Sequence, residues 1–105
     1  MKNTPNSSEF NNCKATNHAY MRAKKRLRWR KEVLDKMMIV AFDTGIQHRE
    51  TKGRLRNYLD KLWLDYKTCN NLRIHGEVIY FFRGKLLITL YRIDNRFLNH
   101  LRKLR

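Results

Sequence analysis

Cysteine is scarce in this chain of 105 residues, which contains only Cys13 and Cys69. One lies in a polar N-terminal stretch and the other near the end of a predicted helix. Two such residues do not make the disulfide framework of a small secreted domain. Neither has a second cysteine or a histidine at metal-ligand spacing, so we expect reduced thiols, no structural metal and no cofactor.

Long apolar runs are also missing. The longest, residues 37–42, falls well short of the roughly 18 residues that a membrane-spanning helix needs. The N-terminus lacks the pattern of a signal peptide, and no phosphate-binding loop, dinucleotide-binding motif or G-x-S-x-G motif occurs. The sequence therefore predicts a cytoplasmic protein that does not act in a membrane.

Acidic residues are few, since 9 Asp and Glu stand against 24 Lys and Arg, which gives a formal net charge of +15. An excess of one sign repels itself and does not help the chain to fold. It attracts anions, of which nucleic acids are the commonest extended form in cells. A charged surface that serves solubility alone is the alternative.

The length of the chain supports one domain, and a change in composition near residue 20 separates this domain from an N-terminal tail. Residues 1–20 are rich in Asn, Ser and Thr, hold the single proline and show no apolar period. Such a segment cannot bury enough surface to offset its ordering entropy. We expect a disordered polar tail over 1–20 and a single basic α+β domain over 21–105, with Met21 as an alternative start.

Two helices are predicted next. Residues 22–43 favour one helix whose first part, RAKKRLRWRK, is basic and whose second part, VLDKMMIVAF, is apolar over a broad arc. The apolar part belongs to the core, and the basic part is expected to project from it. Residues 54–67 repeat apolar side chains at helical spacing and predict the second helix.

Residues 72–92 are rich in β-branched and aromatic residues and predict strands in place of helices. LRIHGEVIYFF and KLLITLY flank Arg83-Gly84, and a two-residue turn there would pair Phe81 with Leu86 and Ile79 with Ile88. Both faces of this hairpin are apolar, so the face away from the helices needs cover from the C-terminal segment or from a second subunit in a homodimer. Residues 94–105 predict a short closing helix.

The expected fold class is therefore α+β: a helical hairpin packed on an antiparallel β-hairpin of two or three strands, with a short C-terminal helix. Within it, the basic run is the leading candidate site, because its seven cations lie along about 15 Å of helix and match the charge density of a nucleic-acid backbone. Trp29 would either stack on an unpaired base or close one end of the core. A second basic cluster opens the second helix, where backbone N–H groups also attract anions. The predicted nucleic-acid-binding residues are Arg22, Lys24, Lys25, Arg26, Arg28, Trp29, Arg30, Lys31, Arg49, Lys52, Arg54 and Arg56.

Catalysis has weaker signals. No histidine stands at a metal-site spacing, although His48 with Glu50, or His75 with Glu77, could act as acid and base in metal-free RNA cleavage.

The two helices followed by NLRIHGEVIYFFRGKLLITLYRID resemble the later part of the RelE/ParE toxin family over roughly residues 50–94. Those proteins are small and basic, place a helical hairpin against an antiparallel sheet, and in some cases cleave messenger RNA on the ribosome without metal. The family opens with a β-strand, whereas this chain opens with a polar tail and a basic helix, so no catalytic residues are carried over. If the resemblance holds, Arg73, Arg83, Arg92 and Tyr91 are the first strand residues to test, on their chemistry alone, because Arg can stabilise a cleaving phosphate and Tyr can stack on a base.

The leading interpretation is a protein that binds DNA or RNA through phosphate contacts of a basic helix, without catalysis and with regulation as one use of the binding. Two alternatives stay open. One is a metal-free, RelE-like ribonuclease toxin, and the other is a small interaction or inhibitor protein that binds an acidic protein partner.

Overall fold

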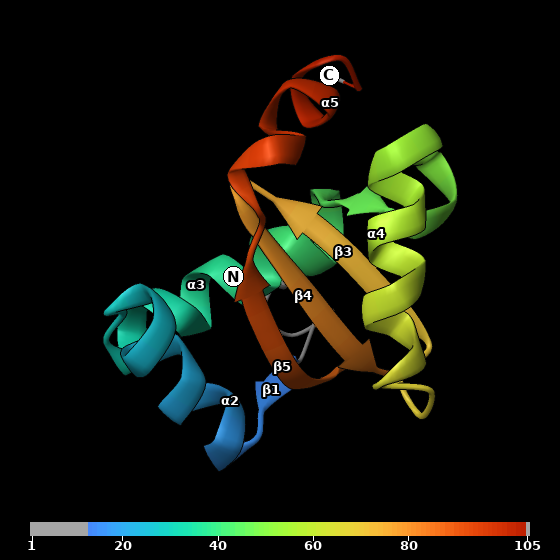
Figure 1. Cartoon of the computed structure of the whole chain (residues 1–105). Coiled ribbons are helices and arrows are strands. Elements are labelled where there is room, and N and C mark those ends of the chain that lie inside the picture. The colour runs from blue at the N-terminus through green and yellow to red at the C-terminus, as the bar shows by residue number, and fades with distance from the viewer. Residues whose placement is uncertain (1–12, 105) are drawn as a thin grey trace, which may run out of the picture.

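A five-stranded sheet lies between two layers of helices in the computed structural model, which describes residues 13–104 (Figure 1). The strand order is β1-β5-β4-β3-β2. The strands are β1 (Lys14–Ala15), β2 (Ile46–Gln47), β3 (Asn71–His75), β4 (Val78–Arg83) and β5 (Leu86–Arg92). β1 pairs with β5 in parallel and all other neighbours are antiparallel, so the sheet is mixed.

The helices divide between the two faces of this sheet. One layer consists of α2 (Asn17–Arg22), its π-helical continuation η1 (Ala23–Leu27) and α3 (Lys31–Thr44). The other consists of α4 (Gly53–Leu64) and α5 (Leu98–Arg102), which follow the 3-10 turns η2 (His48–Glu50) and η3 (Asn95–Phe97). The predicted α+β class and the short C-terminal helix are confirmed. The two- or three-stranded hairpin is wrong, because the edge strands have two residues each and carry no alternating pattern. The predicted helical hairpin is wrong as well, because α3 and α4 pack on opposite faces of the sheet.

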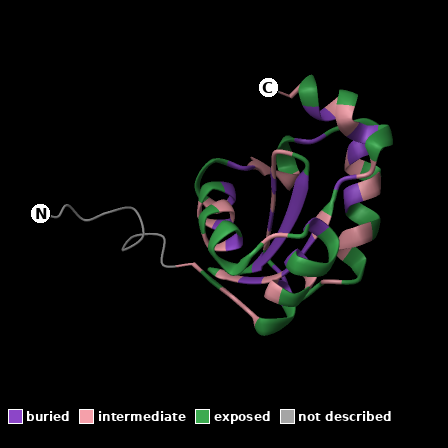
Figure 2. Ribbon diagram, turned by 90° about the vertical axis from the view of Figure 1, so that its left-hand side faces the viewer, coloured by how far each residue is buried: buried purple, intermediate pink, exposed green. Residues whose placement is uncertain are grey.

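The apolar faces of the sheet are both covered from within the chain. Tyr80, Phe82 and Leu90 are fully buried against the α2–η1–α3 layer, whereas Ile79 and Phe81 are fully buried against the α4–α5 layer. Figure 2 shows the buried positions along the strands and on the helix sides that face them. A second subunit is therefore not needed to cover the sheet.

Part of the predicted tail takes part in the fold. Lys14 and Ala15 pair with Leu86 and Leu87, and Thr16 caps α2 by accepting a hydrogen bond from the backbone N–H of Ala19 at 3.0 Å. The prediction of a disordered tail is thus wrong for residues 14–20, because distant pairing and a local cap overcome a composition that favours disorder. Residues 1–12 lie outside the described residues, and the prediction for them stays a prediction.

The predicted single helix over 22–43 is interrupted. The helix starts earlier, at Asn17, and ends after Leu27, where Arg28 adopts a left-handed conformation with φ 59°. Trp29 and Arg30 lead into a new helix that begins at Lys31. The basic segment does not project, because Ala19, Ala23 and Leu27, four residues apart, bury it against the sheet.

The hairpin between β4 and β5 also differs in register. Gly84, with φ 61°, opens a turn that pairs Arg83 with Leu86, and a bulge at the step between Phe81 and Phe82 brings Phe81 opposite Thr89. The predicted pairs Phe81–Leu86 and Ile79–Ile88 are wrong, because the turn is displaced by one residue and the bulge adds Ile88. In residues 13–104, no helix combines the length and the apolar character that crossing a membrane requires.

Candidate nucleic-acid interface

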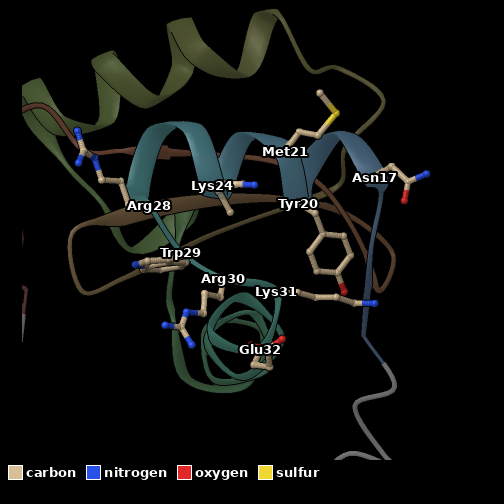
Figure 3. Close-up of a pocket in the computed structure, with 10 residues that line it drawn as sticks. Asn17, Tyr20, Met21, Lys24, Arg28, Trp29, Arg30, Lys31 and Glu32 are labelled. Atoms are coloured by element: carbon tan, nitrogen blue, oxygen red, sulfur yellow. The ribbon is translucent and has the colours of Figure 1, made fainter.

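A cavity of about 810 Å³ opens between α2–η1 and the start of α3 (Figure 3). Its rim carries four basic side chains, those of Lys24, Arg28, Arg30 and Lys31, and one acidic side chain, that of Glu32. We call this cavity the basic groove. Its volume lies in the range of about 300–1,000 Å³ that is typical of ligand pockets.

The groove exists because the chain turns sharply after η1. The backbone N–H of Arg28 donates to the carbonyl of Lys24 at 3.0 Å, and that of Trp29 donates to the carbonyl of Ala23 at 3.2 Å. Arg28 then takes the left-handed conformation and Arg30 an extended one, so α3 starts beside α2 rather than continuing it. A left-handed arginine costs about 1–2 kcal/mol relative to glycine. The sequence thus keeps a cation at a position where backbone geometry favours glycine.

The lining of the groove is mainly basic. Within residues 13–104, none of the four basic side chains on the rim forms an ion pair. All four are exposed. Four cations against one carboxylate give the groove a net positive field toward an anion.

Aromatic side chains form the inner surface of the groove. Trp29 and Tyr20 are half-buried and pack against the core under α2 and α3, and Figure 3 shows both between the two helices. The Tyr20 hydroxyl donates to the carboxylate of Asp35 and so joins α2 to α3. Burial and this hydrogen bond raise the pKa of Tyr20 to about 12. The Lys31 ammonium lies 5.5 Å from the centre of the Tyr20 ring.

Arg22 and Arg26, although part of the predicted site, point away from the groove to β5. Arg22 donates to the hydroxyls of Thr89 and Tyr66, and Arg26 donates to the carbonyl of Leu90 at 2.9 Å. The Arg26 guanidinium also lies 4.2 Å from the centre of the Tyr91 ring. These two arginines fasten the helical layer to the strand edge, which is a structural task. Lys25 is exposed and lines a separate hollow with both of them.

The hydroxyls of Tyr66 and Tyr91 hydrogen-bond to each other beside these arginines. Burial acts to raise the pKa of Tyr66, but the hydrogen bonds with Tyr91 and Arg22 outweigh it and hold that pKa below its ordinary value. For Tyr91, burial and the same tyrosine pair raise the pKa. The arginines therefore stabilise this polar contact between the turn after α4 and β5.

The second basic cluster lies elsewhere. Arg49, Lys52, Arg54 and Arg56 precede or open α4, which covers the opposite face of the sheet (Figure 1). Arg56 lies 3.6 Å from the carboxylate of Asp60 and donates to the carbonyl of Thr51. The structure therefore does not join the two clusters in one cradle.

The candidate acid–base pairs are not assembled. The Glu50 side chain accepts from the backbone N–H of Gln47 at 2.7 Å, and His48 contacts Asp60 at 2.7 Å instead of Glu50. Glu77 lies 3.6 Å from Arg92. In the described part of the chain, no three His, Cys, Asp or Glu side chains gather in a way that could hold a metal ion.

The strand residues named as the first to test for ribonuclease activity are dispersed as well. Arg73 donates to the carbonyl of Gly45 and to the side chain of Asn71, whereas Arg92 pairs with Glu77. Arg83 stands at the β4–β5 turn and Tyr91 contacts Tyr66. No single site contains them.

Sequence reasoning missed Tyr20 and Met21 as parts of the groove, because both fell at the boundary of the presumed tail. The spacing of Ala19, Ala23 and Leu27 was the signal that could have extended the helix to include them. No family model, no curated protein and no solved structure matches the chain.

Proposed function

We propose that this protein binds nucleic acid and that the basic groove is the contact surface. One observation carries the proposal: four exposed cations surround one cavity and have no acidic partner within residues 13–104. A polyphosphate backbone supplies regularly spaced anions, and its binding releases condensed counterions, which favours association.

The four cations suit this task in two ways. The guanidinium groups of Arg28 and Arg30 can each fork two hydrogen bonds to one phosphate, whereas Lys24 and Lys31 act as point charges. The start of α3 adds to them, because its first residues line the groove and the Arg30 side chain makes no cap hydrogen bond to the helix. Free backbone N–H groups in a first helical turn favour anions.

The test is binding of a labelled oligonucleotide, followed by fluorescence anisotropy across a salt series. Four phosphate contacts predict that log K falls against log salt with a slope of about −3. The double variant Lys24→Gln/Arg30→Gln should reduce the steepness of this slope by about 1.5.

The matched control is Lys52→Gln/Arg54→Gln, which removes the same charge from the exposed start of α4. It should leave the slope within about 0.5 of the unmodified protein. A flat salt response, or equal losses in both double variants, would contradict the proposal.

The ribonuclease alternative has less support, since its candidate strand residues are dispersed, and Arg73, Arg92 and Tyr91 are used in internal contacts. Incubation of RNA with the pure protein and ribosomes in EDTA tests it directly. Cleavage that is lost in Arg92→Ala would favour it over binding alone.

An acidic protein partner would exploit the same positive field. Pull-down from a nuclease-treated lysate separates the two, because capture that depends on nucleic acid disappears after the treatment. Retention of one protein in that experiment, together with absent oligonucleotide binding, would replace the nucleic-acid proposal.

A further inference from the structure

We infer that the basic groove selects single-stranded nucleic acid, with one unpaired base stacked against Trp29 and the adjoining phosphates held by the rim cations. This inference rests on the proposed function and specifies its substrate class. It concerns which part of a nucleotide each side of the groove contacts.

The first support is the mixed chemistry of the lining. A ligand made of phosphates alone would use the cations and would gain nothing from the half-buried ring of Trp29. Met21, on the same lining, leaves 66% of its surface exposed, which is a large apolar exposure beside several cations. A nucleotide combines a flat apolar base with an anionic phosphate, and it matches both parts of the lining.

The second support is access. In a duplex the base faces are covered by their neighbours, so paired bases cannot reach an indole that is set between two helices. Duplex phosphates could still touch the rim, where Lys24, Arg28 and Arg30 are exposed. Only an unpaired base can enter the groove and contact its apolar surface. The groove therefore distinguishes single-stranded from double-stranded nucleic acid.

The third support is that the groove is held in place before any ligand binds. The Tyr20–Asp35 hydrogen bond links the two walls, and the backbone of Trp29 is fixed by its hydrogen bond to Ala23. Preorganised walls lower the cost of ordering side chains on binding.

The experiment compares a single strand with a duplex of the same sequence and length. Because the chain has two tryptophans, the variant Trp63→Phe leaves Trp29 as the one reporter. The single strand should quench its fluorescence and bind at least about 5-fold more tightly than the duplex. Trp29→Ala should lower single-strand affinity by about 5- to 140-fold while leaving both the duplex affinity and the salt slope unchanged. Trp29→Phe should recover part of the loss, because a smaller ring still stacks.

Each outcome is decisive. Salt-dependent binding with equal affinity for both nucleic acids, unaffected by Trp29→Ala, overturns the single-strand inference and leaves the proposed function standing. Absence of salt-dependent binding overturns both. If Trp29→Ala does not fold, acrylamide quenching of Trp63→Phe decides, since the single strand should shield the indole of Trp29 and the duplex should not. Equal shielding by both would sink the inference.

Discussion

Two basic regions lie on opposite faces of one sheet, and they use their charges differently. The groove beside α2–η1 and α3 holds cations without acidic partners within residues 13–104. In the region of α4, Asp60 contacts both Arg56 and His48, so part of the charge is compensated internally. A count of lysines and arginines does not separate the two regions, whereas the position of nearby carboxylates does.

The regions also attach to the sheet in different ways. α4 buries large side chains, Leu55 and Leu59, whereas α2–η1 buries the small side chains of Ala19 and Ala23 and has one large buried side chain, Leu27, at its end. Small residues bring the helix backbone close to the sheet and leave its outer side free for charge. The basic segment is therefore both a binding surface and part of the core.

The largest effect should come from removing all four groove cations, Lys24, Arg28, Arg30 and Lys31, by change to Gln. At about 0.1 M salt, loss of four phosphate contacts should weaken oligonucleotide binding by about 10²- to 10³-fold. The quadruple change of Arg49, Lys52, Arg54 and Arg56 to Gln removes the same charge and should cost less than about 10-fold. Anisotropy titrations of both proteins measure the difference, and equal losses would show that net charge alone drives binding.

Overpacking the helix–sheet contact should have the next largest effect. Ala23 is 1% exposed, so Ala23→Leu forces α2–η1 away from β5 and should lower the free energy of unfolding by about 1–3 kcal/mol. Urea unfolding followed by circular dichroism measures the change. Lys25→Leu places the same side chain on the exposed side and should change it by less than about 0.5 kcal/mol. Similar values for the two variants would mean that Ala23 is not tightly packed.

Arg30→Ser should move stability and binding in opposite directions. Arg30 is the N-cap of α3, has extended backbone angles and makes no side-chain cap hydrogen bond. Serine would supply that bond and should stabilise the protein by about 1 kcal/mol. The lost cation should weaken oligonucleotide binding by about 5-fold at about 0.1 M salt. Thermal unfolding and anisotropy on the same sample check both quantities. A rise in both stability and oligonucleotide affinity would exclude a direct contact by Arg30.

The smallest effect should appear at alkaline pH. Burial and the hydrogen bond to Asp35 raise the pKa of Tyr20 to about 12, above the ordinary value of 10.0. The unfolded chain then releases this proton first, so the stabilising contribution is complete below about pH 10 and is lost as pH rises to about 12. Tyr20→Phe should lose less stability across this range, as urea unfolding at several pH values would measure. Parallel curves for the two proteins would contradict a protonated Tyr20 in the folded state.

The sequence predicted secondary structure correctly in long segments with many large apolar side chains. α4 follows the helical period of Leu55, Leu59 and Leu62, and β4 and β5 are the expected short runs of β-branched, aromatic and other apolar residues. The α+β class and the closing helix followed from these segments. The location of charge on the first helical region was also visible in the sequence, although its function stays a proposal.

The remaining features depend on contacts between residues far apart in the sequence. β1 and β2 have two residues each, and pairing with β5 and β3 is what makes them strands. The break at Arg28 has no glycine or proline to mark it, so the run reads as one continuous helix. The bulge near Phe82 displaces the register without a local signal. The groove depends on that break, which is why its shape could not be predicted.

The left-handed arginine has a consequence for selection experiments. A library at position 28 screened for heat resistance should enrich glycine, since glycine adopts the φ of 59° without steric cost. The same library sorted by capture on an oligonucleotide should retain arginine. The two screens would therefore rank glycine and arginine at position 28 in opposite orders. That reversal would show that residue 28 favours ligand binding at the expense of backbone strain.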